Sequence, residues 1–439
     1  MENKLSLDSP VVIVRVHRNE NSLGKALDLC QAFQGVSTKT QILIKPNLVF
    51  WDDTFPFPLY GLLTTTRVVE AFLIYLKERG FEKITIGEGA MMYNQRLNDT
   101  TKTTYQRLGY YRFIKRYGIK LIDFFDEPFS PVNQGGVRMG IAKSVLETEF
   151  LVTLPVLKTH GQTKASLGIK NLKGTVNMKT RRFFHSPKVN LEHCIALLGQ
   201  FLRPKLSIID GIYGLERGPF FFGQAHRFDT ILISKNPLAA DAAACHLMGI
   251  DPEKVTHLQL MSQLLEFPMG ERDLKFLGDP PRNFKKNLQW DPEWMEDGSG
   301  PVGFKEMGIE GINIPKYDNT LCTGCSFLMN PLLVMLLSLW KRGKKSSGFE
   351  VLTGKVMQSH GGYEKTFLLG QCMIKANRSN SKIRYAIPIP GCPPTLDDLI
   401  KVFKENGVEV DLGDYLNYRK HLVERYKLNS QFDPKDFFE

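Results

Sequence analysis

Short apolar runs rich in β-branched residues alternate with stretches of helical periodicity along the first 250 residues, and this alternation constrains the fold most strongly. The runs are predicted as buried strands, namely Val11 to Val16, Gln41 to Lys45, Lys83 to Gly87, Gly118 to Asp123, Phe150 to Val156, Lys205 to Asp210 and Thr230 to Ser234. The helical patterns are Ser22 to Phe33, Arg67 to Arg79 and Pro237 to Met248. Strands and helices in alternation predict an α/β domain with a largely parallel sheet.

The composition changes after residue 250, where Pro, Gly, Trp and mixed charge replace the alternating pattern up to residue 316. A second, smaller α/β pattern follows, and a helical pattern ends the chain. We therefore divide the sequence into an α/β domain (1–250), a connecting region (251–316), a cysteine-bearing domain (317–415) and a C-terminal helix and tail (416–439).

The start of the chain, Met1 to Pro10, is polar and acidic and does not resemble a secretory signal, so we expect a cytoplasmic protein. The longest apolar run, Phe327 to Trp340, is shorter than the roughly 20 residues that a bilayer requires. We expect this run to form a buried helix, with an interfacial anchor as the alternative, and we expect no transmembrane segment.

Seven cysteines in such a chain favour metal or redox chemistry over disulfides. Three of them lie in apolar helical surroundings and are predicted as core residues: Cys30, Cys194 and Cys245. The other four are candidate metal ligands: Cys322, Cys325, Cys372 and Cys392. The first two form a Cys-x-x-Cys pair, and each of the others directly follows a predicted strand.

Loops after parallel strands meet at one edge of a sheet, so the four candidate thiols are expected to converge. Four thiolates suit either tetrahedral zinc or a 4Fe-4S cluster. One tight pair joined by two single cysteines favours the cluster, because structural zinc commonly uses two tight pairs. The alternatives left open are zinc at this site and a cluster that only stabilises the fold.

The motifs around these cysteines resemble the proximal-cluster domain of nickel–iron hydrogenase small subunits. They are Cys322-Thr323-Gly324-Cys325-Ser326, a Gly-x-Cys at Gly370 to Cys372, and Ile389-Pro390-Gly391-Cys392-Pro393-Pro394 followed by a helical pattern. The resemblance covers roughly residues 317–412 and implies a flavodoxin-like domain with one 4Fe-4S cluster. Since cysteines for further clusters or for a nickel–iron centre are missing from the sequence, it does not imply a hydrogenase.

A basic segment (residues 158–188) carries much of the net charge of +11. Between residues 150 and 191 there are eight Lys or Arg and neither Asp nor Glu. Glycines between the bases would let the backbone approach an anion, so the composition favours a phosphate- or carboxylate-rich ligand. A solvated basic loop is the alternative, and the chain contains neither a Walker loop nor a dinucleotide-binding glycine fingerprint.

A second set of motifs resembles the family called domain of unknown function 362 over roughly residues 11–248. The set comprises Lys45-Pro46-Asn47-Leu48, Thr64-Thr65-Thr66-Arg67, Gly87-Glu88-Gly89, Leu157-Lys158-Thr159-His160, Gly168 to Gly174, and Ile209 to Glu216. Several follow predicted strands, so Glu88 and Asp210 are expected at the same sheet edge as the bases. Candidate anion or substrate contacts are Lys45, Asn47, Lys158, His160, Lys170, Asn171, Lys173 and Arg181; His160 and His185 are candidate acid/base groups.

These features lead to an oxidoreductase hypothesis, in which one 4Fe-4S cluster passes single electrons to an anionic substrate or cofactor bound by residues 158–188. A second hypothesis is a non-catalytic electron-transfer subunit that serves a redox partner protein. A third is a nucleic-acid-binding protein with a structural cluster or zinc, with Phe183 and Phe184 as stacking groups, although no recognised binding motif supports it.

Overall fold

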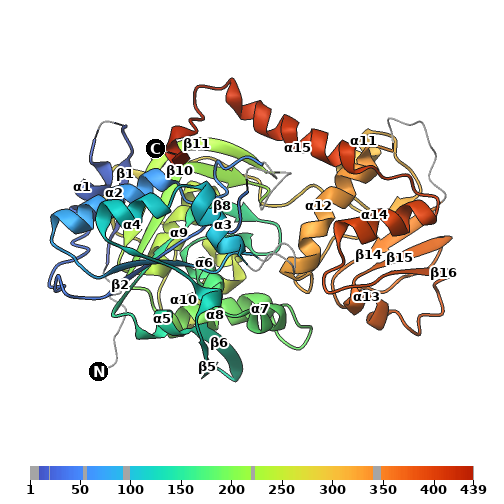
Figure 1. The fold of residues 1–439 in the computed structure, drawn as a ribbon, viewed down its shortest axis with the longest axis horizontal. Coiled ribbons are helices and arrows are strands. Elements are labelled where there is room, and N and C mark those ends of the chain that lie inside the picture. Colours follow the sequence, from blue (N-terminus) through green and yellow to red (C-terminus); the bar gives the residue numbers. More distant parts are fainter. Residues whose placement is uncertain are drawn as a thin grey trace.

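The computed structural model describes residues 9–18, 20–52, 57–91, 99–218, 223–339 and 348–438. They form a larger and a smaller α/β unit that lie side by side, joined along one side by helix α15 (Leu412–Lys427) (Figure 1).

A ten-stranded sheet forms the centre of the larger unit, with the order β12-β1-β11-β10-β7-β2-β3-β4 and with β8 and β9 attached to β10. Its strands are β1 (Val11–Arg15), β2 (Ile42–Pro46), β3 (Ile84–Glu88), β4 (Lys120–Asp123), β7 (Phe150–Leu154), β8 (Val156–His160), β9 (Lys164–Ala165), β10 (Leu206–Glu216), β11 (Gln224–Ser234) and β12 (Phe276–Gly278). The pairs β1·β11, β10·β11 and β8·β9 are antiparallel, and the others are parallel. The predicted mostly parallel sheet is confirmed.

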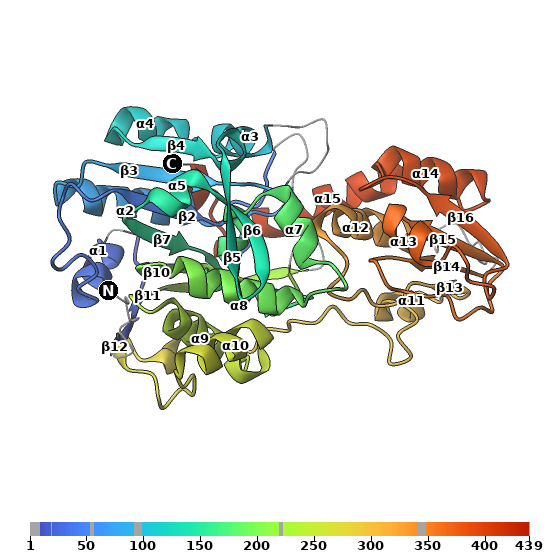
Figure 2. The same ribbon diagram turned by 90° about the horizontal axis from the view of Figure 1, so that it is seen from below.

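Both faces of this sheet are covered, because successive side chains of a strand point to opposite faces. Val12 and Ile44 belong to one apolar core, which also contains residues of α1 (Ser22–Leu29) and α2 (Thr66–Glu78). Val11 and Leu43 belong to the other, with residues of α6 (Gly168–Asn171), α8 (Leu191–Leu202) and α9 (Pro237–Leu247). Burial on both faces explains why the strands read as continuous apolar runs (Figure 2).

Helix starts follow the capping signals of the sequence. The side chain of Asn236 accepts hydrogen bonds from the backbone N–H groups of Leu238 and Ala239, and Pro237 occupies the first turn of α9. Thr65 caps α2 in the same way, by accepting from the N–H of Val68.

The remaining elements of the larger unit are α3 (Thr100–Arg107), α4 (Tyr111–Tyr117), α5 (Lys143–Glu147), α7 (Met178–Phe184), and the hairpin β5 (Phe129–Gln134) and β6 (Val137–Ala142).

The smaller unit contains a parallel sheet in the order β13-β14-β15-β16, with the strands β13 (Ile312–Asn313), β14 (Phe349–Leu352), β15 (Lys365–Leu369) and β16 (Tyr385–Ile389). Its helices are α12 (Thr323–Leu337), α13 (Gln371–Ala376) and α14 (Leu396–Glu405). Helix α12 is buried along most of its length, as predicted for the run from Phe327; Trp340 lies outside the described residues. Within the described chain, no helix has both the length and the apolar character needed to cross a membrane.

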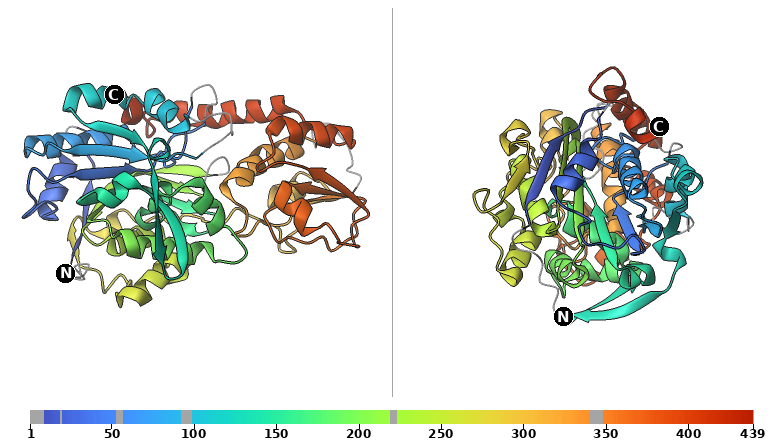
Figure 3. Two further views of the ribbon diagram at one scale, coloured as in Figure 1. Left: turned by 60° about the horizontal axis from the view of Figure 1, so that its bottom comes forward. Right: turned by 90° about the vertical axis from the view of Figure 1, so that its left-hand side faces the viewer.

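The structure divides the expected connecting region (251–316) between the two units. Helix α10 (Thr256–Leu265) packs on α8, and β12 pairs with β1, so this part belongs to the larger unit. Helix α11 (Val302–Glu306) and β13 lie with the smaller sheet, since β13 pairs with β14. The tail then returns: α15 packs on α12, and α16 (Lys435–Phe438) packs on α2 (Figure 3).

Candidate functional site

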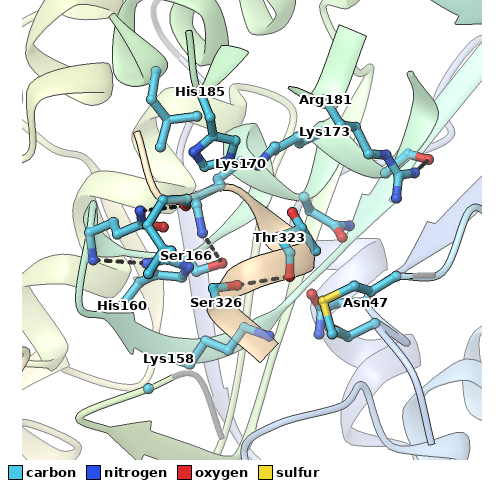
Figure 4. Close-up of a pocket in the computed structure, with 18 of the residues that line it drawn as sticks. Asn47, Lys158, His160, Ser166, Lys170, Lys173, Arg181, His185, Thr323 and Ser326 are labelled. Atoms are coloured by element: carbon cyan, nitrogen blue, oxygen red, sulfur yellow. Dashed lines mark hydrogen bonds between the residues drawn. The ribbon is translucent and has the colours of Figure 1, made fainter. Parts of the chain in front are cut away.

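A cavity of about 210 Å³ lies where the two units meet. Its charged lining comes from the larger unit, and α12 of the smaller unit forms another part of its wall. All eight candidate anion contacts line this basic cavity: Lys45, Asn47, Lys158, His160, Lys170, Asn171, Lys173 and Arg181 (Figure 4). The structure thus brings together side chains spread over more than 130 positions of the sequence, because they lie at or just beyond strand ends and in the α6–α7 segment.

Lys45 and Glu88 form a buried ion pair in this cavity, with 2.7 Å between Lys45 Nζ and Glu88 Oε1. Lys45 Nζ also donates to the side-chain oxygen of Asn171 at 3.0 Å. The carboxylate of Glu88 accepts from the backbone N–H groups of Leu48 and Gly89. Lys45 is therefore held in place by protein groups.

Gly174 allows this arrangement to form. A Cβ atom at that position would lie 2.5 Å from Lys45 Cε and 2.8 Å from Glu88 Oε1. Only glycine leaves room for the ion pair beside the backbone of the basic segment.

Arg181 acts mainly as a structural support of the cavity wall. Its guanidinium donates to the carbonyl oxygens of Val176, Gly89, Ala90 and Gly174 at 2.7–3.2 Å. These four bonds use most of the donors of the side chain. Arg181 contributes positive charge to the site, but fewer of its N–H groups are left for a ligand than the sequence suggested.

Lys158 is buried and Lys170 is partly buried, and neither forms an ion pair with a carboxylate in the part of the chain that the structure describes. Lys158 Nζ donates to the carbonyl of Leu62 at 3.0 Å. Burial, followed by the nearby charge of Lys45, lowers the pKa of Lys158 to about 7. Burial and then the charge of Lys173 lower the pKa of Lys170 well below its usual value. An anion in the cavity would favour the charged form of both lysines.

Lys173 contacts His185, with 2.7 Å between Lys173 Nζ and His185 Nε2. His185 Nδ1 lies 2.7 Å from the carbonyl oxygen of Asn319, so Nδ1 carries the proton and Nε2 accepts from the lysine. Burial, then the charge of Arg181, lowers the pKa of Lys173 to about 7. This chain of contacts connects the basic segment to the loop that precedes Cys322.

His160 is the second candidate acid/base group in the cavity. Its Nδ1 accepts from the backbone N–H of Gln162 at 3.1 Å. Burial, then the charge of Lys170, lowers its pKa well below the usual value, so the neutral ring with the proton on Nε2 is favoured. The Gln162 side chain in turn donates to the carbonyls of Asp318 and Leu321, a second connection between the two units.

The four candidate metal ligands line one smaller cavity: Cys322, Cys325, Cys372 and Cys392. Cys322 is the N-cap residue of α12, Cys372 lies in the first turn of α13 after β15, and Cys392 follows β16. Among the described residues, no three His, Cys, Asp or Glu side chains form a group that could hold a metal ion. A cubane cluster binds each thiolate to a different iron, so its sulfurs surround a space instead of meeting at one point.

The cysteine cavity and the basic cavity adjoin. Arg181, Leu321 and Thr323 line both of them. Thr323 directly follows Cys322 at the start of α12, and its side chain lies on the side of the helix that faces the basic cavity (Figure 4).

Several other residues singled out in the sequence lie in the core of the larger unit and do not line the basic cavity. Asp210 does not line the basic cavity: it is fully buried and accepts from Thr65 and from the N–H of Ile212, and burial raises its pKa to about 6. Phe184 is a core residue with no exposure, which removes it as a stacking group. Cys30, Cys194 and Cys245 are buried core residues, as predicted.

Sequence reasoning missed the contribution of α12 and of the segment before it. Ser326, Asn330, Met329 and Leu333 line the basic cavity, as do Gln162, Ser166, Arg217, Trp294 and Tyr317. The spacing of the polar residues of α12 could have indicated this contribution. Thr323, Ser326 and Asn330 are three and four residues apart and therefore share one helix face.

Residues 42–246 match the model of the family described as a domain of unknown function, DUF362, which confirms the resemblance of the larger unit. The chain is similar to the thylakoid-associated protein sll1697 of Synechocystis sp., with 22% identity over 228 residues, 51% of this chain and 68% of that protein. The lactate racemase apoprotein of Thermoanaerobacterium thermosaccharolyticum aligns over 98% of this chain and 92% of its own, at 11% identity and a TM-score of 0.33. A similarity of that extent carries no argument about function.

Proposed function

We propose that this protein is an iron–sulfur oxidoreductase, in which one 4Fe-4S cluster exchanges single electrons with an anionic substrate or cofactor in the basic cavity. The observation that supports this proposal best is the common wall of the two cavities, formed by Arg181, Leu321 and Thr323. Electron exchange requires a short separation, and the two cavities share these lining residues.

The four cysteines suit a cluster as its ligands. Two of them lie in or at the first turn of α12, three positions apart on one side of the helix. The loops after two parallel strands supply the others. Gly370 leaves room for this arrangement, since a Cβ there would lie 3.1 Å from Cys325 Sγ. When bound, the cluster would supply one-electron transfer.

The resemblance of the cysteine-bearing unit to a flavodoxin-like proximal-cluster domain is part of the proposal. Its parallel sheet and the motifs around the cysteines support this resemblance. The strand order follows the sequence, whereas a flavodoxin-like sheet has the order 2-1-3-4-5. The four cysteines that line one cavity therefore support the cluster more strongly than the topology of the sheet does.

Buried cations support the anionic nature of the ligand. Lys158, Lys170 and Lys173 are desolvated, and the cavity has one described carboxylate, that of Glu88, which Lys45 already neutralises. Burying charge without a partner is costly, so an anion that neutralises these lysines would bind tightly.

The test is anaerobic purification followed by analysis of iron, sulfide and zinc, and by EPR before and after dithionite. We expect about four irons per chain and a reducible signal that Cys372→Ser loses. Cys30→Ala is the matched control, because Cys30 is buried in the core and does not line the cysteine cavity, so this variant should retain the iron. Stoichiometric zinc without iron would contradict the proposal.

A non-catalytic electron-transfer subunit is the second candidate function, and the exposure of Cys392 favours it, because a partner protein can approach that edge of the cysteine cavity. A stable complex with one partner and no turnover by the chain alone would distinguish it. Nucleic-acid binding has less support, since Lys158 lies 3% exposed inside a cavity and cannot reach a phosphate backbone.

A further inference from the structure

The cavity-lining face of α12 differs from the rest of the helix. Its hydroxyl and amide side chains are Thr323, Ser326 and Asn330, and all three line the basic cavity. The helix is otherwise almost entirely apolar and buried. A helix that only packed in a core would not place its polar groups along one stripe.

Asn330 is the most informative member of this stripe. It is partly buried, and its side-chain amide makes no hydrogen bond to any residue that the structure describes. Ser326, one turn earlier, donates to the carbonyl of Thr323 at 2.9 Å, which leaves its oxygen able to accept. Both side chains therefore offer hydrogen bonds to a ligand in the cavity.

The stripe ends in an apolar region. Met329 and Leu333 are four residues apart on α12 and line the cavity together with Val49 and Met91, whose backbones are joined by a hydrogen bond of 2.6 Å. From Thr323 to Leu333 the helix rises by about 15 Å. The α12 side of the cavity wall thus passes from the hydroxyl groups of Thr323 and Ser326, through the amide of Asn330, to the hydrocarbon of Leu333.

We propose that the ligand of the basic cavity is a small amphipathic oxyanion: a phosphate or carboxylate that lies among the lysines, joined to an uncharged body. The body hydrogen-bonds to Ser326 and Asn330 and ends in hydrocarbon at Met329 and Leu333. This inference depends on the proposed anion site and adds the class of molecule that the site selects. A cavity of about 210 Å³ restricts the ligand to a small molecule.

Calorimetric titration of the anaerobically purified intact chain tests this inference without a turnover assay. The probes are two pairs, each an anion alone and the same anion joined to a chain that carries a hydroxyl and then ends in hydrocarbon: inorganic phosphate with 2-hydroxybutyl phosphate, and acetate with 3-hydroxyhexanoate. In at least one pair the longer molecule should bind at least tenfold more tightly than the anion alone.

Asn330→Leu separates recognition of the body from recognition of the anion. The variant should weaken binding of the longer molecule about tenfold and change binding of the anion alone by less than twofold. Asn283→Leu is the control, because Asn283 is exposed and does not line the cavity, and it should change neither affinity.

Equal affinities within both pairs for the wild-type chain would overturn the inference while leaving the anion site in place. A loss of binding of the anion alone in Asn330→Leu, equal to the loss for the longer molecule, would also overturn it. If no probe binds at all, both this inference and the anion site fail, whereas the iron and EPR analysis of the cysteines is unaffected.

Discussion

Lys45 Nζ lies 2.7 Å from Glu88 Oε1, and the two side chains are 2% and 3% exposed. The pair joins the ends of the neighbouring strands β2 and β3 and closes one side of the basic cavity. Its partners are 43 positions apart in the sequence, so the pair exists only because the two parallel strands are adjacent.

Removing the charge of Glu88 should therefore be strongly destabilising. Glu88→Gln leaves Lys45 as a buried cation without a counter-ion, and we expect a loss of about 3–5 kcal/mol in the free energy of unfolding. Guanidinium denaturation measures it. The double variant Lys45→Met, Glu88→Leu is the control and should lose less than the single variant. A loss below about 1 kcal/mol for Glu88→Gln would show that the pair contributes little.

Lys158 should make the stability of the ligand-free protein depend on pH. Its pKa is about 7 in the folded protein and about 10.4 in an unfolded chain. The unfolded state therefore binds more protons between these values. The cost of burying the charge is present in full below pH 7 and disappears as the pH rises to about 10.4. The charged or titratable groups that act with it are Lys45, Glu88, Lys170 and His160.

The measurement is the difference in unfolding free energy between Lys158→Met and the wild type at pH 7, 8 and 9. The variant should be the more stable at pH 7, and its advantage should shrink toward pH 9. A difference that stays constant over this range would show that Lys158 is not desolvated as the structure indicates.

Gly174→Ala tests the close approach of the basic segment to the ion pair. The added Cβ would meet Lys45 Cε at 2.5 Å, so we expect a loss of about 1–3 kcal/mol together with weaker binding of phosphate. Gly303→Ala is the control, since nothing lies within 4 Å of a Cβ at that position of α11. Equal effects of the two substitutions in denaturation and in phosphate titration would contradict the assignment.

Asp436 anchors the C-terminal tail to the larger unit. Its carboxylate accepts from Tyr213 at 2.6 Å and pairs with Arg67 and Arg227 at 3.2 Å, and the residue is 1% exposed. Asp436→Asn should lower the free energy of unfolding by about 1.5–3 kcal/mol and make the tail more accessible to proteases. Asp397→Asn, at an exposed position of α14, is a control for charge alone. Unchanged proteolysis of the Asp436 variant would contradict the anchoring role.

The central strands of the larger unit could be predicted because burial on both faces leaves a local signal, a continuous apolar run. The hairpin β5–β6 and the short strands β8, β9 and β12 were not predicted as separate strands, and β10 was predicted to end at Asp210. Asp210 and Gly211 have the composition of a turn, yet the strand continues through them to Glu216 with a bulge between Gly211 and Tyr213. Pairing with β11 and β8 supplies the hydrogen bonds that keep these residues extended, and that pairing has no local signature.

The residues of the candidate site were predictable to the extent that they follow strands. Lys45 and Lys158 were expected at one sheet edge, and the structure places both in the basic cavity. The role of Arg181 was not predictable, because its donors are used by carbonyl groups of segments that are distant in sequence. The basic cavity itself was also hidden, since part of its wall belongs to α12, which is distant in sequence from the bases.

The sequence by itself determined the alternation of strands and helices in the larger unit and the separation of the three core cysteines from the four that line one cavity. These properties depend on side-chain type and spacing along a short stretch of chain. Only the tertiary structure decided that Glu88 neutralises Lys45, that Lys158 is buried without a carboxylate partner among the described residues, and that the polar stripe of α12 lines the same cavity. The free energy of a buried charge depends on every group around it, and in this protein those groups come from segments that meet only when both units are packed together.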